Sequence, residues 1–156
     1  NASDLIDNAV KEVRSISHNM MPVALTQLGL ISAVKELTNK MNDSGLLSVK
    51  FESNIETRLN SSIEISIYRV IQEILNNTIK HAQAKVIVIL LTKEKERLTL
   101  QISDDGIGFN TNEIENSKGI GWKSIFSRIA MLNGDINVAS SKEKGTNLLV
   151  SIPVNE

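Results

Sequence analysis

The sequence predicts an α+β fold, a two-layer α/β sandwich in which helices cover one face of a mixed sheet. From residue 46 onward, the expected elements follow in the order strand, helix, strand, strand, loop, helix, strand, strand, which is typical of this class. The expected strands alternate apolar and polar residues or are rich in β-branched ones, whereas the helices place apolar residues at helical spacing. The 156 residues are 41% hydrophobic and 22% charged, so the chain can bury a core.

Two helices are expected before residue 45. Residues 3–21 carry an apolar stripe, with Ser3 as a candidate N-cap and Pro22 as the residue that stops the helix. Residues 22–30 are expected to form a connector. A second helix is predicted over about residues 29–42, where an Asn-Asp-Ser-Gly sequence ends it.

The rest of the chain alternates between strands and helices. The expected strands cover residues 46–54, 85–93, 98–104, 135–141 and 146–154, and the expected helices cover residues 61–81 and 121–133. Ser61 and Ser62, with Glu64 close behind, signal the start of the first of these helices. The polar segment 110–118 is neither periodic nor apolar, so we expect it to be a loop.

Composition excludes several classes of function. Lys and Arg number 17 and Asp and Glu 18, and this balance argues against extensive binding to nucleic acid or to an anionic membrane. The absence of cysteine excludes disulfides, thiolate catalysis and cysteine-based metal sites. Two histidines are too few to suggest a zinc site. No apolar run approaches the roughly 20 residues that span a bilayer.

The stretch EILNNTIKHAQA, residues 73–84, carries polar residues on a helix that is otherwise rich in isoleucine and leucine. At about 100° per residue, four polar side chains fall within one arc of roughly 100°: Glu73, Asn77, Lys80 and His81. One interpretation is a solvated face. The other is a ligand site, because adjacent asparagines are poor helix formers, and a carboxylate, an amide and an ammonium together suit a metal and phosphate.

Three glycine motifs follow, each with a simple structural interpretation. DDGIGF at 104–109 ends an expected strand; it is typical of a turn, or of a backbone that lets a flat or phosphorylated ligand approach. KGIGWK at 118–123 opens a helix; it indicates a hinge, or backbone N–H groups that bind an anion. Gly145 and Thr146 first indicate a hairpin turn. Each of these motifs is weak alone, but together with the polar stretch at 73–84 they make four motifs in a specific order.

The order E-x-x-x-N-x-x-K-H, D-x-G-x-G-F, G-x-G at a helix start, and G-T resembles the ATP-binding domain shared by sensor histidine kinases, gyrase-type ATPases and related chaperones. NNTIKHAQAK, SDDGIGF and GWKSIFSRIAMLNGDINVASSKEKGTNLLVSIP resemble one subgroup, the nitrate-sensor and DegS-like histidine kinases of bacterial two-component systems. The likeness covers about residues 8–154. It implies the histidine-kinase/gyrase-type ATPase fold, with residues 22–156 as the ATP-binding catalytic domain and residues 1–21 as the end of a dimerisation and phosphotransfer hairpin.

The resemblance implies roles for the residues that would hold the phosphates. Asn77 would ligate Mg²⁺ that bridges the ATP phosphates. Glu73 would orient a metal-bound water or assist proton removal at the attacking nucleophile. Lys80 would contact phosphate, and His81 would make a neighbouring polar contact to the nucleotide. Backbone amides near two glycines would hold phosphates: Gly119 and Gly121.

The resemblance also implies the residues around the base. Asp104 would accept a hydrogen bond from the exocyclic amine of adenine and so select ATP over GTP. Thr146 would lie near the adenine, acting directly or through water. Gly106 and Gly108 would let the nucleotide lie against the backbone. The loop 110–118 would then be a lid that becomes ordered when nucleotide binds.

By the same resemblance, the reaction is transfer of phosphoryl from Mg-ATP to a histidine, and onward to the aspartate of a response regulator. The acceptor histidine of this subgroup lies in an H-D or H-E context early in the first hairpin helix, and nothing like it occurs here. His18, in RSISHNMMP, matches the end of the second hairpin helix, and we expect a surface or interdomain residue. We therefore expect an enzyme fragment that does not phosphorylate itself.

The partners expected by resemblance are the kinase's own hairpin, in a homodimer of the intact protein, and a response regulator, but no nucleic acid. The fragment is expected to be a cytoplasmic domain of a membrane-anchored sensor, with the membrane reached only through upstream regions. Two alternatives stay open: a related-fold serine-kinase anti-sigma factor or ATPase, and a non-catalytic nucleotide-binding docking module. The EVRSISHNMMP junction and the Lys-His pair after Asn77 favour the histidine kinase over the related enzymes.

Overall fold

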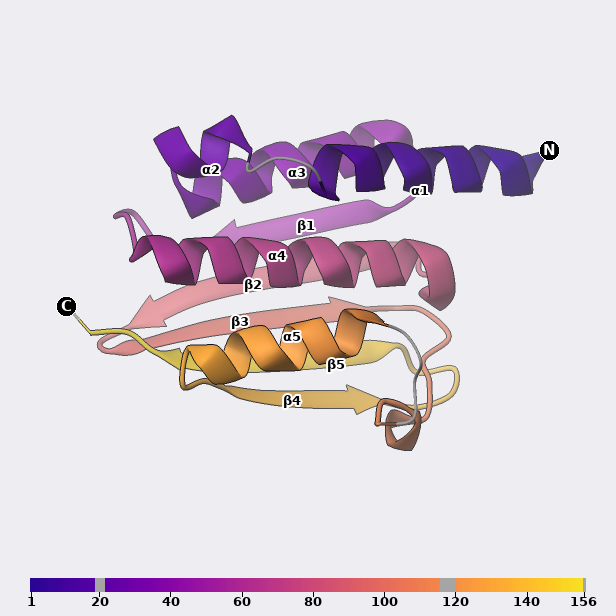
Figure 1. The fold of residues 1–156 in the computed structure, drawn as a ribbon. Helices are drawn as coiled ribbons and strands as arrows, with labels where there is room; N and C mark the ends of the chain where they lie inside the picture. Colours follow the sequence, from indigo (N-terminus) through magenta and orange to yellow (C-terminus); the bar gives the residue numbers. More distant parts are fainter. Residues whose placement is uncertain (19–21, 116–119, 156) are drawn as a thin grey trace.

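The computed structural model describes residues 1–18, 22–115 and 120–155, and it consists of a sheet with helices on one face (Figure 1). The five strands are β1 Ser48–Ser53, β2 Val86–Glu94, β3 Arg97–Asp104, β4 Asp135–Ser140 and β5 Thr146–Pro153. They lie in the order β1-β2-β3-β5-β4, with β1 parallel to β2 and the other pairs antiparallel. The predicted α+β sandwich with a mixed sheet is therefore confirmed.

The helices are α1 Ala2–His18, α2 Val23–Gln27, α3 Leu30–Ser44, α4 Ser61–Asn77 and α5 Ile120–Met131. A π-helical turn, η1 Thr78–Ala82, continues α4, and a short 3-10 turn, η2 Thr111–Glu113, follows β3. Because β1 and β2 are parallel, the chain must cross over between them, and α4 is that crossover. No helix within the described residues is long and apolar enough to cross a membrane.

Buried side chains of α4, α5 and the sheet form the core between the two layers. Alternate residues of the central strands point toward the helices and are almost completely buried: Ile87, Ile89, Leu91, Leu98, Leu100, Ile102, Leu148, Val150 and Ile152. The side of α4 and η1 opposite the predicted polar arc is also buried, and it includes Ile67, Ile71, Ile74 and Thr78. The predicted division of this helix into an apolar and a polar face is therefore confirmed.

The pairing of β3 with β5 places two polar residues, Asp104 and Thr146, opposite each other. Ile102 pairs with Leu148, and two positions further along, Asp104 pairs with Thr146. Since side chains alternate along a strand, Asp104 and Thr146 point to the helix side of the sheet, at the end where the strands stop. The sandwich thus places two polar side chains under the C-terminal end of α4.

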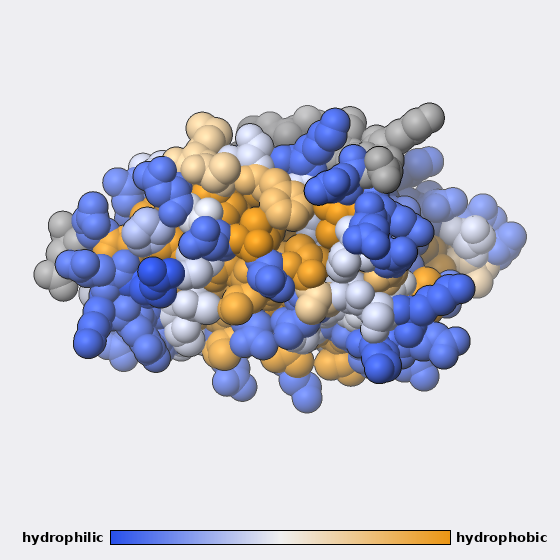
Figure 2. Space-filling model, turned by 90° about the horizontal axis from the view of Figure 1, so that it is seen from below, coloured by the Kyte–Doolittle hydropathy of each residue, from blue (hydrophilic) through white to orange (hydrophobic). Residues whose placement is uncertain are grey.

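Figure 2 shows the molecule from below the view of Figure 1, which is the side on which β4 lies. In Figure 2 apolar residues gather in the middle of this view, with hydrophilic residues at both ends. In β4 and just after α5, the partly buried side chains of Leu132, Ile136 and Val138 pack against the core.

The expected N-cap of the first helix is wrong, whereas the expected start of α4 at Ser61 is confirmed. Ser3 lies inside α1, and Asn1 caps the helix, because its Oδ1 accepts a hydrogen bond from the Ser3 N–H at 2.8 Å. The N-cap of α4 is Asn60, whose Oδ1 accepts from the Ser62 N–H at 2.9 Å. In both cases an asparagine two residues before the serine satisfies a free N–H of the first turn.

The connector expected over residues 22–30 contains the short helix α2. This helix forms because Leu25 is buried in the core and Pro22 fixes the backbone before the first turn. Gly29, with φ of 94°, then allows the chain to turn into α3. The expected end of the first helix at residues 19–21 lies outside the described residues.

Candidate functional site

A cavity of about 480 Å³ opens where α4 and η1 face the loop after β3 and the start of α5. Six of the residues predicted from the sequence line it: Asn77, His81, Asp104, Gly108, Gly121 and Thr146. Motifs that lie far apart in the sequence therefore meet at one cavity. Of the predicted residues that the structure describes, Glu73, Lys80 and Gly106 do not line it, and Gly119 lies outside the described residues.

Gly121 brings the start of α5 against the polar face of α4. A Cβ added at Gly121 would collide with Oε1 of Glu73 and would lie 3.3 Å from Nδ2 of Asn77. Only a glycine fits here without displacing Glu73. The carboxylate of Glu73 and the amide of Asn77, one helical turn apart, therefore lie together beside the first turn of α5, where backbone N–H groups favour negative charge.

The π-helical turn η1 joins the polar face of α4 to the loop after β3. The carbonyl oxygen of Ala82 accepts a hydrogen bond from the Ile107 N–H at 2.8 Å. Gly106 packs so closely on the end of η1 that an added Cβ would lie 2.8 Å from the Ala82 Cβ. Gly106 thus allows the loop to pack on η1, whereas its predicted contact with nucleotide remains a prediction. Lys80 lies in η1 and is partly buried.

Asp104 is a half-buried carboxylate at the cavity. Its Oδ1 accepts a hydrogen bond from the Gly106 N–H at 2.8 Å. Burial raises the pKa of Asp104, and the charge of Asp105 adds to this, while hydrogen bonds from the backbone of Gly106 and Thr146 oppose it. The result is a hydrogen-bond acceptor at the cavity that backbone groups hold in place.

The neighbouring Asp105 has a structural role instead. Its Oδ1 accepts hydrogen bonds from the backbone N–H groups of Lys85 at 2.8 Å and Val86 at 2.9 Å. Hydrogen bonds from Val86 and Lys85 are the main causes that lower the pKa of Asp105, which is exposed. Asp105 thus ties the start of β2 to the end of β3, and the two adjacent aspartates serve different purposes.

Apolar side chains that the sequence interpretation did not assign complete the cavity wall. Ile74, Phe109, Ile114 and Trp122 are among the residues that line it. The ring centroids of Phe109 and Trp122 lie 5.7 Å apart, at an interplanar angle of 48°. The available signal was the position of these two aromatic residues directly beside the glycine motifs.

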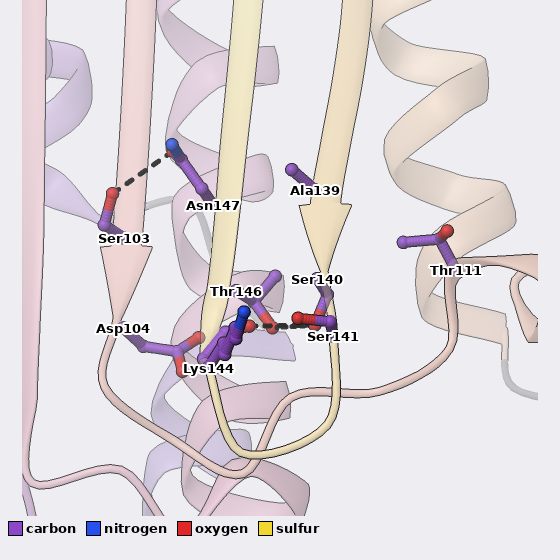
Figure 3. A pocket seen from close by; sticks show the side chains of 10 residues that line it. Ser103, Asp104, Thr111, Ala139, Ser140, Ser141, Lys144, Thr146 and Asn147 are labelled. Carbon is purple, nitrogen blue, oxygen red and sulfur yellow. Dashed lines mark hydrogen bonds between the residues drawn. The ribbon is translucent and has the colours of Figure 1, made fainter.

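A second cavity of about 530 Å³ lies beyond Asp104 and Thr146, which line both cavities. It is bounded by the ends of β3, β4 and β5 and by Thr111 (Figure 3). Ser103 donates to the Oδ1 of Asn147 at 3.2 Å along one side of it. Asp104 and Thr146 therefore form the boundary between an apolar-walled cavity and a polar one.

The donor groups beside Gly121 fit magnesium. Within the described residues there is no group of three His, Cys, Asp or Glu side chains that would hold a metal alone. Glu73 and Asn77 offer hard oxygen atoms, and Mg²⁺ commonly takes only one or two protein ligands, with waters and substrate phosphates completing its shell. The site thus fits a magnesium ion that binds together with a phosphorylated ligand.

Comparison with solved structures shows the same fold in histidine kinases. The histidine kinase domain of the blue-light activated histidine kinase from Erythrobacter litoralis EL346 has a TM-score of 0.64 at 20% identity, covering 78% of this chain and 63% of that one. The Acinetobacter baumannii histidine kinase AdeS has a TM-score of 0.63 at 16% identity, covering 97% of this chain and 76% of that one.

Sequence comparison gives the family. The oxygen sensor histidine kinase NreB of Staphylococcus carnosus (strain TM300) is 27% identical over 164 residues, covering 98% of this chain and 47% of that protein. The chain thus spans about half the length of this relative. Residues 62–156, from the first turn of α4 onward, match the family described as histidine kinase-, DNA gyrase B-, and HSP90-like ATPase. The chain belongs to this family of ATPases.

Proposed function

We propose that the chain is the ATP-binding catalytic part of a sensor histidine kinase, which transfers the γ-phosphoryl group of ATP to a histidine on a dimerisation hairpin. The observation that carries the proposal is the convergence of Asn77, Asp104, Gly121 and Thr146, from four separate motifs, on one cavity. Family membership and the likeness to NreB over nearly the whole chain support it. NreB is itself an oxygen sensor histidine kinase.

The phosphate end of the site is the part next to α5. Asn77 would hold Mg²⁺, which supplies positive charge to the phosphates when bound. Gly121 lets the first turn of α5 pack beside Glu73 and Asn77, where its backbone N–H groups would face the phosphates, and Gly119 would contribute in the same way. Lys80 adds a cation from η1, and His81 lines the cavity one turn beyond Asn77.

Glu73 is the proposed base or orienting group. Its carboxylate lies against Gly121 at the same end of the site as Asn77. A carboxylate there can accept the proton of the attacking imidazole or hold a water in position. Phosphoryl transfer depends mainly on such positioning and on neutralisation of charge, so a small number of well-placed polar groups suffices.

The base end of the site is the part next to the sheet. Asp104 would accept from the exocyclic amine of adenine, with Gly106 holding its Oδ1 and Gly108 letting the loop pass close to the ligand. Thr146 lies beside it in the register. A guanine carbonyl at that position would face a carboxylate, which favours ATP over GTP.

The proposed partners follow from α1. Residues 1–21 would be the end of the second hairpin helix, and α1 leaves apolar Leu5 and Ile6 exposed, at 70% and 42%. In an intact kinase this surface would pair with the rest of the hairpin in a homodimer. His18, the last residue of α1, would not be the acceptor. The phosphorylated hairpin would pass its phosphoryl group to a response regulator, and a sensor region upstream would anchor the kinase in the membrane and leave this domain in the cytoplasm.

The direct test is phosphoryl transfer in trans. The chain is mixed with radiolabelled ATP, Mg²⁺ and a separately supplied hairpin that carries an H-D or H-E helix. We expect acid-labile, base-stable label on the hairpin and none on the chain alone. Acid-stable label would indicate a serine kinase, release of inorganic phosphate without labelling would indicate an ATPase, and either result would contradict the proposal.

A further inference from the structure

Ser140 lies next to the base end of the cavity and makes three hydrogen bonds through one oxygen atom. It is the last residue of β4 and pairs with Thr146 at the start of β5. Its Oγ accepts from the Phe109 N–H at 2.9 Å and donates to the carbonyl oxygen of Gly145 at 3.0 Å. The third partner is Oγ1 of Thr146, at 2.9 Å (Figure 3).

The direction of the bond between the two hydroxyl groups follows from the other two partners. A serine hydroxyl has one hydrogen and can accept through two lone pairs. The carbonyl of Gly145 can only accept, so the single hydrogen of Ser140 goes to it. All three hydrogen bonds can form together only if Thr146 donates its hydrogen to Ser140.

This assignment determines what Thr146 offers to a ligand. Its only hydroxyl hydrogen is already used, so its remaining capacity toward the cavity is as an acceptor. Asp104, its partner in the register, also accepts through its carboxylate. The two side chains at the base end of the cavity thus both present acceptors, and a ligand group that carries N–H donors satisfies them whereas a carbonyl does not.

We propose that Ser140 is a positioning residue that fixes the Thr146 hydroxyl as an acceptor and thereby selects a purine with an amino group over one with a carbonyl at the same position. This inference rests on the proposed ATP-binding function. Ser140 would not touch the nucleotide in this role, because it acts through Thr146. The selection is a matter of hydrogen-bond polarity, since an amino group and a carbonyl oxygen are similar in size.

The test compares the dissociation constants of ATP and inosine triphosphate, which carries a carbonyl in place of the amino group. The proteins are the wild type, Ser140→Ala, Ser140→Thr and the control Ser141→Ala, which removes the neighbouring exposed hydroxyl. The wild type is expected to prefer ATP. In Ser140→Ala the Thr146 hydrogen is released and can turn to the carbonyl, so the preference falls by about threefold to tenfold, as for one hydrogen bond.

The ratio of the two constants separates positioning from simple loss of structure. Ser140→Ala also removes the acceptor for the Phe109 N–H, and loss of that bond alone would weaken binding of both nucleotides alike without changing the ratio. Ser140→Thr keeps a hydroxyl and should restore the ratio, and Ser141→Ala should leave it as in the wild type. If Ser140→Ala does not fold, Thr146→Val removes the same acceptor and must also reduce the preference for ATP.

The outcomes distinguish this inference from the function on which it rests. A wild type that prefers ATP, with Ser140→Ala or Thr146→Val retaining the full preference, overturns the role of Ser140 and leaves the ATP site standing. A wild type that binds neither nucleotide overturns the proposed function together with the inference.

Discussion

Asp104 and Asp105 are neighbours of the same type, yet their surroundings shift their pKa values in opposite directions. Asp104 is half-buried at the cavity, and burial raises its pKa. Asp105 is exposed, and backbone hydrogen bonds from Val86 and Lys85 lower its pKa. The first arrangement costs folding free energy and is typical of a functional site, whereas the second contributes to stability.

Removal of the Asp105 carboxylate is expected to destabilise the fold without affecting nucleotide binding directly. Asp105→Ala leaves two backbone N–H groups at the start of β2 without their partner, and we expect a loss of about 1 kcal/mol in the free energy of unfolding. Urea denaturation measures it, with Asp43→Ala, an exposed aspartate near the end of α3, as the control.

The pH dependence of this loss follows from the direction of the shift. The pKa of Asp105 is lower in the folded protein than its ordinary value of 3.8, so its contribution is fully present above pH 3.8. It decreases as the pH falls through the folded-state pKa, where the carboxylate takes up a proton. The stability difference between wild type and Asp105→Ala should therefore disappear in strong acid; a difference that grows as the pH falls would contradict this assignment.

At the scale of elements, the contact between α4 and α5 depends on Gly121. We expect Gly121→Ala to lower the free energy of unfolding by up to about 1 kcal/mol, because its Cβ would push aside the end of the flexible Glu73 side chain. ATP affinity should fall as well, since the carboxylate and the first turn of α5 must move apart. Ser127→Ala, on an exposed position of the same helix, should leave both unchanged.

A double variant tests the cause of that effect. Glu73→Ala in the Gly121→Ala background removes the colliding carboxylate, so thermal unfolding should return toward the wild-type temperature. Phosphoryl transfer should stay absent, because Glu73 is the proposed base. Stability that does not recover would show that the helices are held apart by something other than Glu73.

The start of α4 is held by a buried carboxylate. Glu64 is 2% exposed and accepts from the Leu59 N–H at 3.0 Å and from Nη2 of Arg58 at 2.9 Å. Arg58 reaches further, donating to the carbonyl oxygen of Leu25 in α2 at 3.4 Å. The network therefore ties α2 to the same helix that carries Asn77 at its other end.

Loss of this carboxylate should destabilise the domain more than loss of an exposed ion pair. Glu64→Ala is expected to lower the free energy of unfolding by about 2 kcal/mol, since it leaves the partly buried Leu59 N–H without its acceptor and removes the carboxylate that Arg58 binds. Glu36→Ala removes a carboxylate that pairs with Lys40 on the surface and should cost less than about 0.5 kcal/mol. Equal losses in chemical denaturation would contradict the account.

At the scale of the whole molecule, local patterns predicted most elements because each strand and long helix has a face that must be buried. Buried apolar residues recur at every second position in the strands that contain Ile102 and Leu148. In α4, around Ile67 and Ile71, they recur at helical spacing. The family was predicted from four motifs in order and is confirmed. The helix α2 was not predicted, because five residues carry too little pattern and burial of Leu25 decides its structure.

Only the residues of the site that belong to sequence motifs could be predicted. The motifs identified Asn77, Asp104 and Thr146, which line one cavity. Ser140 was not identified, because its importance comes from the register of β4 with β5 and from three hydrogen bonds across the chain. Glu64 was taken as a helix-start signal, and only the fold brings it to Arg58. Contacts of this kind depend on tertiary structure, which a single sequence does not reveal.

The central claim is that the cavity binds Mg-ATP through Asn77, and calorimetric titration of ATP tests it most directly. The wild type, Asn77→Ala and the control Asn39→Ala, on the exposed side of α3, are titrated with and without Mg²⁺. We predict saturable binding to the wild type and to Asn39→Ala that requires Mg²⁺ for full affinity, and at least about a tenfold loss in Asn77→Ala. Equal Mg²⁺-dependent affinity in all three proteins, or no binding to the wild type, would contradict the claim.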